Sequence, residues 1–471
     1  MLATLQLTSC SFIIIGGSKD SVSTDAVTQL ESTPADDNYI ENRFNSARAE
    51  AKSALDAVAE GDYDGMMFLF VCSDLAAAFG DANSERVLPR EKYARIKTLN
   101  ERLNTDIILS EVPYDEIAAG LMTNENSGMV FAHMLEVEVF RVGTLAQAGL
   151  VGNMHALPFI DFTKPYYDSN FVEDMDTPSG LFAIYGDACM DENKPKAVYY
   201  NERIAIEAGV QELEAVVREG AWTLDKLAEC IKAADASSDV GSYSGAVIPQ
   251  TADFLNTVYV GAGLKSTKLE GGELTLADNS ERLDNILVKL KDFVPLCVLD
   301  TDDEAPAEHI FMDGGALFYI GSLGGVRDFY HMDDTWGVLP IPTADGGVDY
   351  RSAVHPYTQV VCYPSSGVKA AETYVMIDSF FACSYKIFDA ALEDDYLHSY
   401  ARNAKPLGML GYIMSGIRFD LLDGYGEVCP RAKAATFKAL EQSYWDDILY
   451  SERFAGLRTD GNADLALVKK P

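Results

Sequence analysis

Polar and aromatic side chains follow the short apolar runs of this sequence, at the points where those runs end. The set combines aromatic rings with carboxylates, hydroxyls and imidazoles: Ser73, Asp74, His133, Glu136, Tyr185, Asp187, Phe254, Tyr319, Ser322, His355 and Tyr357. Short apolar runs closed by polar residues are typical of buried strands, and open α/β sheets bind ligands beyond the carboxyl ends of their strands. Aromatic faces beside carboxylates suit sugar rings, which have apolar faces and a rim of hydroxyls. We therefore predict a ligand site built from these residues.

Ordinary structural roles stay open for several of these candidates. Tyr185 and Tyr319 fit core positions as well as stacking positions. His133 and His355 are more often structural histidines with satisfied hydrogen bonds. Asp74 is of the type that caps a following helix.

The sequence lacks the motifs that define common enzyme classes. It contains no GxGxxG, Walker, GxSxG or HExxH pattern and no EF-hand loop. Its six histidines are scattered and its eight cysteines form no CxxC pair, so we predict no metal and no cofactor. Acidic pairs such as Asp302-Asp303 are expected on the surface of so acidic a chain. We predict no catalytic residues and keep a glycoside-processing enzyme as a less favoured alternative, since it would need one carboxylate pair at a set separation.

Length and charge limit the class of protein. With 471 residues, of which 48% are hydrophobic, the chain is long enough for two or three globular domains. Its 73 acidic and 37 basic residues give a formal net charge of −36, which argues against nucleic acid or an anionic membrane surface as partner. A solvated acidic surface is the simplest interpretation. A field that attracts cationic ligands is the alternative.

The central stretch at 179–234 organises the predicted elements. Apolar runs at 181–185 and 197–200 predict strands, residues 204–208 predict a helix, and Thr223 is an N-cap type that opens the next helix. Further strands are predicted at 66–72, 107–109, 129–135, 246–248 and 360–364, and helices at 41–60, 93–103, 139–147, 254–260, 283–293 and 370–383. Such alternation indicates α/β lobes with parallel sheets.

Several motifs together resemble bacterial extracellular solute-binding proteins of ABC transporters, the maltose-binding-protein-like family 1. They are Tyr199-Tyr200-Asn201, Ala208-Gly209, the GAWTLDKL segment at 220–227, and the DFTKPYYD segment at 161–168, which has Tyr-Tyr where Trp-Trp is common in the family. The resemblance covers about residues 62 to 430. It implies an α/β, two-lobed, type II periplasmic-binding-protein-like fold, in which helices flank a mixed or parallel sheet in each lobe and a hinge joins the lobes.

The resemblance also implies domain bounds. Residues 62–180 plus 338–388 are expected in the N-lobe, and 187–332 plus 389–471 in the C-lobe, with the proline-containing segment at 336–342 as the return crossing. Residues 11–61 are expected to form a tether and a leading helix. Trp222 is interpreted as structural.

The first ten residues resemble a truncated lipoprotein signal. Leu7-Thr8-Ser9-Cys10 fits a lipobox, but the basic and apolar regions that normally precede one are missing, so we expect the true start to lie upstream. An ordinary buried cysteine is the alternative interpretation. No apolar run is long enough to span a membrane.

The function implied by the resemblance is that of a solute-binding lipoprotein of an ABC importer. It would capture a carbohydrate between the lobes and deliver it to the permease subunits. The expected carbohydrate is an oligosaccharide. The protein would be a monomer at the extracellular face of the cell membrane or in the periplasm, anchored by lipidated Cys10. Alternatives are a binding protein for a cationic solute or peptide, and a surface sensor or adhesin on the same fold.

Overall fold

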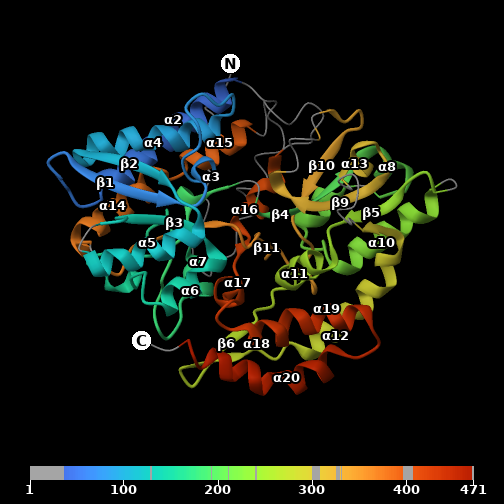
Figure 1. The fold of residues 1–471 in the computed structure, drawn as a ribbon. Helices are drawn as coiled ribbons and strands as arrows, with labels where there is room; N and C mark the ends of the chain where they lie inside the picture. Colours follow the sequence, from blue (N-terminus) through green and yellow to red (C-terminus); the bar gives the residue numbers. More distant parts are fainter. Residues whose placement is uncertain are drawn as a thin grey trace, which may run out of the picture.

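The computed structural model contains two α/β lobes side by side (Figure 1). It describes residues 37–127, 130–191, 194–210, 212–238, 241–299, 308–324, 329, 331–366, 368–395 and 407–468. The predicted lipobox at Cys10 lies outside this part of the chain. Among the helices so described, none is both long and apolar enough to cross a bilayer.

The N-lobe is built on a sheet with the strand order β12-β3-β1-β2. Its strands are β1 (Met66–Cys72), β2 (Thr105–Glu111), β3 (Met134–Glu138) and β12 (Gln359–Cys362). The first three are parallel, and β12 runs antiparallel to β3. Cys72, Leu135 and Val361 therefore lie in one sheet, as the two-lobed prediction requires. The uninterrupted apolar run of β1 is explained by its central place between two neighbouring strands.

Helices cover both faces of this sheet (Figure 1). They are α2 (Asp37–Asp56), α3 (Leu75–Phe79), α4 (Val87–Leu103), α5 (Tyr114–Ser127), α6 (Val142–Gln147), α7 (Ser169–Met175), α14 (Ala370–Ala382) and α15 (Ile387–Asp395). The leading helix predicted at 41–60 corresponds to α2, which buries Ile40 and Phe44 against Phe388 of α15.

The C-lobe sheet has the strand order β10-β4-β9-β5-β8. Its strands are β4 (Lys196–Asn201), β5 (Ser244–Ile248), β8 (Cys297–Leu299), β9 (Ala316–Ser322) and β10 (Trp336–Leu339). Strands β8 and β9 are parallel to β5, whereas β4 is antiparallel to both β9 and β10. The flanking helices are α8 (Glu202–Glu207), α9 (Leu213–Arg218), α10 (Leu224–Ser237), α11 (Thr251–Gly261), α12 (Ser280–Phe293) and α13 (Glu308–Met312).

A helical layer closes the far end of the C-lobe (Figure 1). It contains α18 (Pro430–Lys433), α19 (Ala439–Trp445), α20 (Tyr450–Leu465) and the hairpin of β6 (Thr267–Glu270) and β7 (Glu273–Leu276). The short helix α17 (Leu421–Tyr425) instead packs against α6 and α7 of the N-lobe. Helix α20 packs against α12 and β7, which joins this layer to the rest of the lobe.

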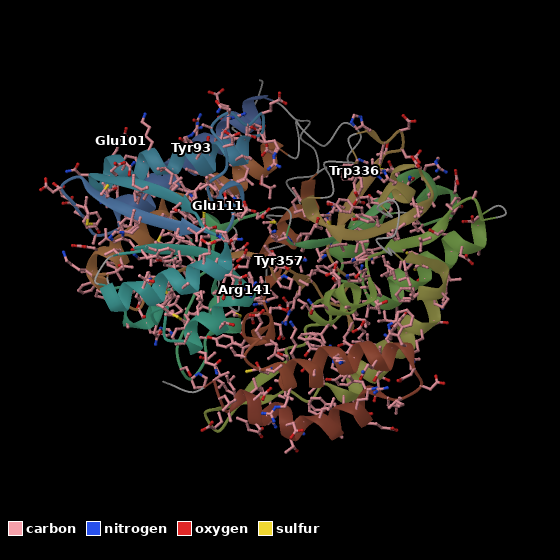
Figure 2. All side chains as sticks on the ribbon, in the orientation of Figure 1. Tyr93, Glu101, Glu111, Arg141, Trp336 and Tyr357 are labelled. Atoms are coloured by element: carbon pink, nitrogen blue, oxygen red, sulfur yellow. The ribbon has the colours of Figure 1, made fainter. Side chains whose placement is uncertain are left out.

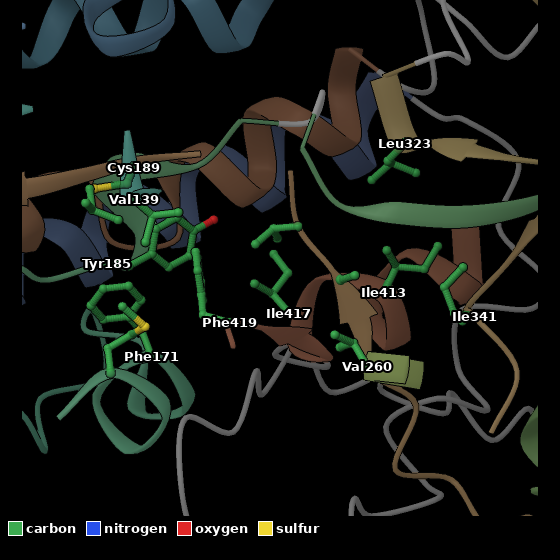
Figure 3. Close-up of a cluster of buried hydrophobic side chains, with 14 of the residues drawn as sticks. Val139, Phe171, Tyr185, Cys189, Val260, Leu323, Ile341, Ile413, Ile417 and Phe419 are labelled. Atoms are coloured by element: carbon green, nitrogen blue, oxygen red, sulfur yellow. The ribbon is translucent and has the colours of Figure 1, made fainter. Parts of the chain in front are cut away.

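The chain leaves the N-lobe after Asp187 and enters the C-lobe at β4, and it crosses between the lobes a second and a third time at 350–358 and 407–420. The second contains β11 (Ser352–Ala353), which pairs in parallel with β13 (Ile417–Arg418) of the third. Helix α16 (Leu410–Ser415) also lies in the third crossing. Figure 3 shows that apolar side chains such as Ile413, Ile417 and Val260 fill this region, so one hydrophobic core runs through both lobes.

The observed crossings correct part of the predicted layout. The segment at 336–342 does not return the chain to the N-lobe, because β10 pairs with β4 as an edge strand of the C-lobe and buries Trp336 against Tyr199. Residues 181–185 form no ladder and make only an isolated bridge, between Ile184 and Val361. Helix α15 lies in the N-lobe, although the prediction assigned residues from 389 onward to the C-lobe, because its Asp395 carboxylate accepts hydrogen bonds from the first turn of α4.

Candidate functional site

A cavity of about 370 Å³ opens at the edge of the C-lobe sheet that faces the N-lobe. Its lining residues are Lys194, Lys196, Pro249, Asp253, Tyr319, Ile320, Gly321, Ser322 and His355. The register explains the grouping: β4 starts at Lys196, directly opposite Ser322 at the carboxyl end of antiparallel β9. Strand β5 ends beside them and leads through Pro249 into α11. The cavity therefore occupies the position in which open α/β sheets bind ligands.

Two lysines and one histidine give the cavity its electrostatic character. Lys196 Nζ lies 2.5 Å from Asp253 Oδ2, and Lys194 Nζ lies 3.7 Å from Asp191 Oδ2. Burial lowers the pKa of His355, and the charges of Lys196 and Lys194 lower it further while Asp253 acts in the opposite sense. These effects together favour the neutral form of the His355 imidazole.

Tyr319 forms one wall of the cavity. Its ring stacks on Tyr199 with centroids 6.0 Å apart, and its hydroxyl donates to Glu308 Oε2 at 3.2 Å. Phe329 packs edge-on against the same ring. The phenol is thus held from several sides and offers a rigid, partly exposed surface to the cavity.

A row of aromatic side chains leads from this cavity to the N-lobe. His355 stacks on Tyr357 with ring centroids 5.0 Å apart at 17°, and Tyr357 meets Phe140 at 5.0 Å and 69°. The Arg141 guanidinium then lies 4.2 Å from the Phe140 ring centroid and 3.8 Å from that of Tyr114. Figure 2 shows Tyr357 and Arg141 between the two lobes. Tyr357 is 52% exposed, so its ring is open to a ligand.

The N-lobe part of this row lies at the carboxyl ends of its strands. Phe140 and Arg141 follow β3 in a short 3-10 turn (Val139–Arg141), and Tyr114 opens the helix after β2. Arg141 Nη1 donates to Glu427 Oε1 at 3.3 Å. Within the described part of the chain, the buried atoms Tyr114 Oη, Arg141 Nε and Glu138 Oε2 make no hydrogen bond. The row therefore ends in polar atoms that a ligand or water could satisfy.

The structure brings some of the predicted residues to this region. Tyr319, Ser322 and His355 line the cavity, and Tyr357 stands at its rim. Ser73 follows β1 at the same edge of the N-lobe sheet, where its hydroxyl lies 3.5 Å from Gln359 Oε1.

Asp74 is placed at that edge but has a structural role. Its carboxylate caps α3 by accepting from the Ala77 amide at 2.9 Å, which was the alternative interpretation from the sequence. Glu136 is 1% exposed and lies inside β3, between Cys72 and Val361 of the neighbouring strands. Its carboxylate faces the lobe interior and not the cavity.

Other predicted residues lie away from the cavity. His133 precedes β3 instead of following it, because the ladder begins at Met134, and its Nδ1 accepts from the Leu69 amide at 2.9 Å. Tyr185 is buried in the core beside Phe171 and Phe419 (Figure 3).

Asp187 and Phe254 are also engaged elsewhere. The Asp187 carboxylate accepts from the Lys386 amide at 2.8 Å, which fastens the N-lobe end of the first crossing to the loop before α15. Phe254 is 2% exposed on the buried side of α11. An aromatic residue one turn into a helix after a strand is placed by that helix's core face, not by the sheet edge.

The sequence reasoning missed Lys194, Lys196 and Asp253, and the N-lobe residues Phe140 and Arg141. A usable signal existed for the last two, which come directly after the run at 134–139, but the predicted end of that strand was placed too early. Among the described residues, no cluster of three or more His, Cys, Asp or Glu side chains is arranged to hold a metal ion. Every cysteine in that part of the chain is a free thiol.

Two α/β lobes joined by crossing segments, with a cavity at the sheet edge of one lobe that faces the other, are typical of a binding-protein fold of the type II class. No family model and no curated protein matches this sequence. A cyclo/maltodextrin-binding protein complexed with maltotetraose is 12% identical with a TM-score of 0.57, covering 88% of this chain and 100% of that chain. MalE, the sugar-binding protein from Xanthomonas citri, is 11% identical with a TM-score of 0.55, covering 85% and 98%.

A third similar structure is the galacto-N-biose-/lacto-N-biose I-binding protein of the ABC transporter from Bifidobacterium longum, complexed with lacto-N-biose. It is 12% identical with a TM-score of 0.52 and covers 86% of this chain and 98% of that chain. At these identities the likeness establishes the fold. It is the MalE-like, type II fold that the sequence motifs implied.

Proposed function

We propose that this protein is a solute-binding protein of an ABC importer that holds a carbohydrate between its lobes without turning it over. The aromatic row from His355 through Tyr357 to Phe140 is the observation that carries the proposal. Such rings cover the apolar faces of sugars, and the row starts at a cavity that offers polar partners. The fold supports the proposal, because the three similar structures are all named as binding proteins and two hold a saccharide.

The bound solute would have one end in the C-lobe cavity and extend along the row toward Arg141. The paired Lys196 and Asp253 offer donor and acceptor groups to hydroxyls at the cavity end, and Ser322 adds a hydroxyl. A ligand that spans both the cavity and several rings is an oligosaccharide. Closing of the lobes about the crossing segments would bury it and bring the two sheet edges together.

Anchoring and delivery belong to the same proposal. Lipidation of Cys10 would hold the protein at the extracellular face of the membrane, where it would pass the solute as a monomer to permease subunits. Expression from an upstream start followed by intact-mass measurement should reveal a diacylglyceryl adduct at Cys10. An unprocessed chain would contradict the anchor but not the binding function.

Calorimetry of the purified protein tests the binding function. The titrants are neutral and acidic oligosaccharides, and polyamines as the cationic alternative, each at low and high salt. We expect saccharide binding at both salt concentrations, whereas binding confined to polyamines and lost at high salt would overturn the proposal. Release of shorter sugars during the incubations would support the enzyme alternative instead.

A further inference from the structure

We propose that the C-lobe cavity receives an anionic substituent of the saccharide, so that the solute is an acidic oligosaccharide; this rests on the proposed function. The chain as a whole has about two acidic residues for each basic one, 73 to 37. The cavity reverses this ratio, because its lining contains Lys194 and Lys196 but only Asp253 as a carboxylate.

Lys196 is a built part of the cavity and not a surface lysine. Its side chain is 9% exposed, and β4 and β9 fix its backbone opposite Ser322. Its ammonium is paired with Asp253, whose side chain is 35% exposed in the first turn of α11. A buried ammonium has three donors, and one carboxylate leaves donors for a second acceptor.

The ion pair of Lys194 with Asp191 is longer than that of Lys196 with Asp253. Lys194 Nζ lies 3.7 Å from Asp191 Oδ2, which is beyond hydrogen-bond distance. The His355 amide donates to the Lys194 carbonyl at 3.1 Å, so the lysine and the imidazole are held on the same wall. An anionic group between the two ammonium groups would make charge-assisted hydrogen bonds, which are stronger than those to a neutral hydroxyl.

The start of α11 adds to this preference. Pro249 and Asp253 both line the cavity, so the first turn of the helix, which begins at Thr251, lies beside it. The amino end of a helix carries a partial positive charge that favours anions. Asp253, in the first turn, already interacts with this positive end of the helix. The two lysines are therefore the main source of the preference for an anion.

The anion is expected as part of a sugar and not as a free ion. A cavity of about 370 Å³ is large enough for a sugar ring, and Tyr319 gives it an aromatic wall. It also continues into the row through His355 and Tyr357, where further rings would lie. Uronate carboxylates, sulfate esters and phosphate esters share the required charge.

A cationic solute is disfavoured by the same wall. Its charge would face two ammonium groups, and the net charge of −36 acts mainly over distances at which salt screens it. Asp191 and Asp253 balance the charges of Lys194 and Lys196, so the net charge beside the cavity is near zero. The preference for an anion over a cation therefore depends on where the two ammonium groups lie. A neutral sugar would accept from Lys196 only through its hydroxyls, in weaker hydrogen bonds than those that an anion makes.

The test compares oligouronates with their methyl esters, which keep the ring and remove the charge. Calorimetry with the full chain should include galacturonate, glucuronate and mannuronate oligomers of matched length, and sulfated and phosphorylated oligosaccharides as separate arms. We expect at least one acidic saccharide to bind about tenfold or more tightly than its neutral counterpart. Its affinity should fall several-fold between low and high salt.

The variant Lys194→Gln assigns the effect to the cavity. We expect it to remove about tenfold from the affinity for the acid and to leave the affinity for the ester unchanged. Lys97→Gln on the exposed face of α4 is the matched control and should change neither. Lys196→Gln is a second variant, whose folding is checked by thermal unfolding because the side chain is buried.

Each outcome separates the inference from the proposed function. If esters and other neutral saccharides bind as tightly as the acids, or if Lys194→Gln weakens both equally, the anionic preference is wrong and the saccharide function stands. If none of the saccharides binds, the proposed function fails and this inference fails with it.

Discussion

Tyr166 Oη lies 2.5 Å from Asp378 Oδ1, and this buried hydrogen bond joins the segment at 161–168 to α14. Tyr167 Oη donates to the same oxygen at 3.0 Å, and Lys164 Nζ lies 2.6 Å from the other. One fully buried carboxylate therefore receives three donors from one motif. Tyr166 and Tyr167 therefore have a defined structural role here, since both phenol hydroxyls donate to Asp378.

Replacing Asp378 should destabilise the protein strongly. Asp378→Ala leaves two buried phenols without their acceptor and removes the counter-charge of Lys164, so we expect a loss of about 3–5 kcal/mol. Tyr166→Phe removes one donor and should cost about 1 kcal/mol. Thermal and urea unfolding measure both, with the exposed Asp106→Ala as control. An Asp378→Ala protein that melts with wild type would contradict this account of the motif.

Glu136 should make the folded protein sensitive to pH. Burial raises its pKa to about 7, which outweighs the opposing charges of Arg95 and Lys92. Because the folded-state pKa lies above the unfolded value, the favourable contribution is complete at low pH and is lost as pH rises through about 7. We therefore expect Glu136→Gln to stabilise the protein at pH 8, by up to about 3 kcal/mol, and to have little effect at pH 4.5.

The measurement is the difference in melting temperature between variant and wild type across this pH range. Glu101→Gln is the control, since that side chain is 70% exposed on α4 (Figure 2). A difference that does not grow with pH would show that Glu136 is ionised throughout. It would also restore Glu136 as a candidate for ligand contact.

Local signals predicted the elements where neighbours in sequence decide the structure. The apolar run of β1 has the predicted bounds, and the Thr223 side chain caps α10 by accepting from the Lys226 amide. Trp222, interpreted as structural, is fully buried and donates from Nε1 to the Pro340 carbonyl at 2.8 Å. In these cases hydrophobic periodicity or a capping residue is sufficient.

Contacts between distant parts of the chain account for the failures. The run at 181–185 has the composition of a strand, but Tyr185 packs against Phe419 from the third crossing, which no local pattern reveals. A lysine at the start of a strand looks like a surface residue. Lys196 is buried because α11 brings Asp253 to it from 57 positions along the sequence. The cavity could therefore not be predicted without the register of β4 against β9, which places Lys196 opposite Ser322.

Tyr357 should contribute to saccharide affinity without supporting the fold. Tyr357 is 52% exposed and its ring packs on His355 and Phe140, so Tyr357→Ala should weaken binding of a saccharide about tenfold through loss of stacking. Tyr93→Ala is the matched control, because that ring is 49% exposed on α4, away from the cavity (Figure 2). Both variants should melt close to wild type. Equal affinities for the two variants would remove the aromatic row from the site.

His355 should make the affinity for an acidic saccharide depend on pH. Its pKa in the free protein is lowered by burial and by Lys196 and Lys194, and a bound anion would favour the protonated imidazole. The complex then binds more protons than the free protein, so affinity for an oligouronate should rise as pH falls from 7.5 to 5.5, by about three- to tenfold. Uronate carboxyls stay ionised throughout this range.

Calorimetry at several pH values measures this change in affinity, with the methyl ester as the pH-independent comparison. The variant His355→Asn keeps an acceptor for the Tyr357 amide and should give a flat profile. A wild-type affinity that stays constant or falls toward pH 5.5 would show that the anion does not lie beside His355.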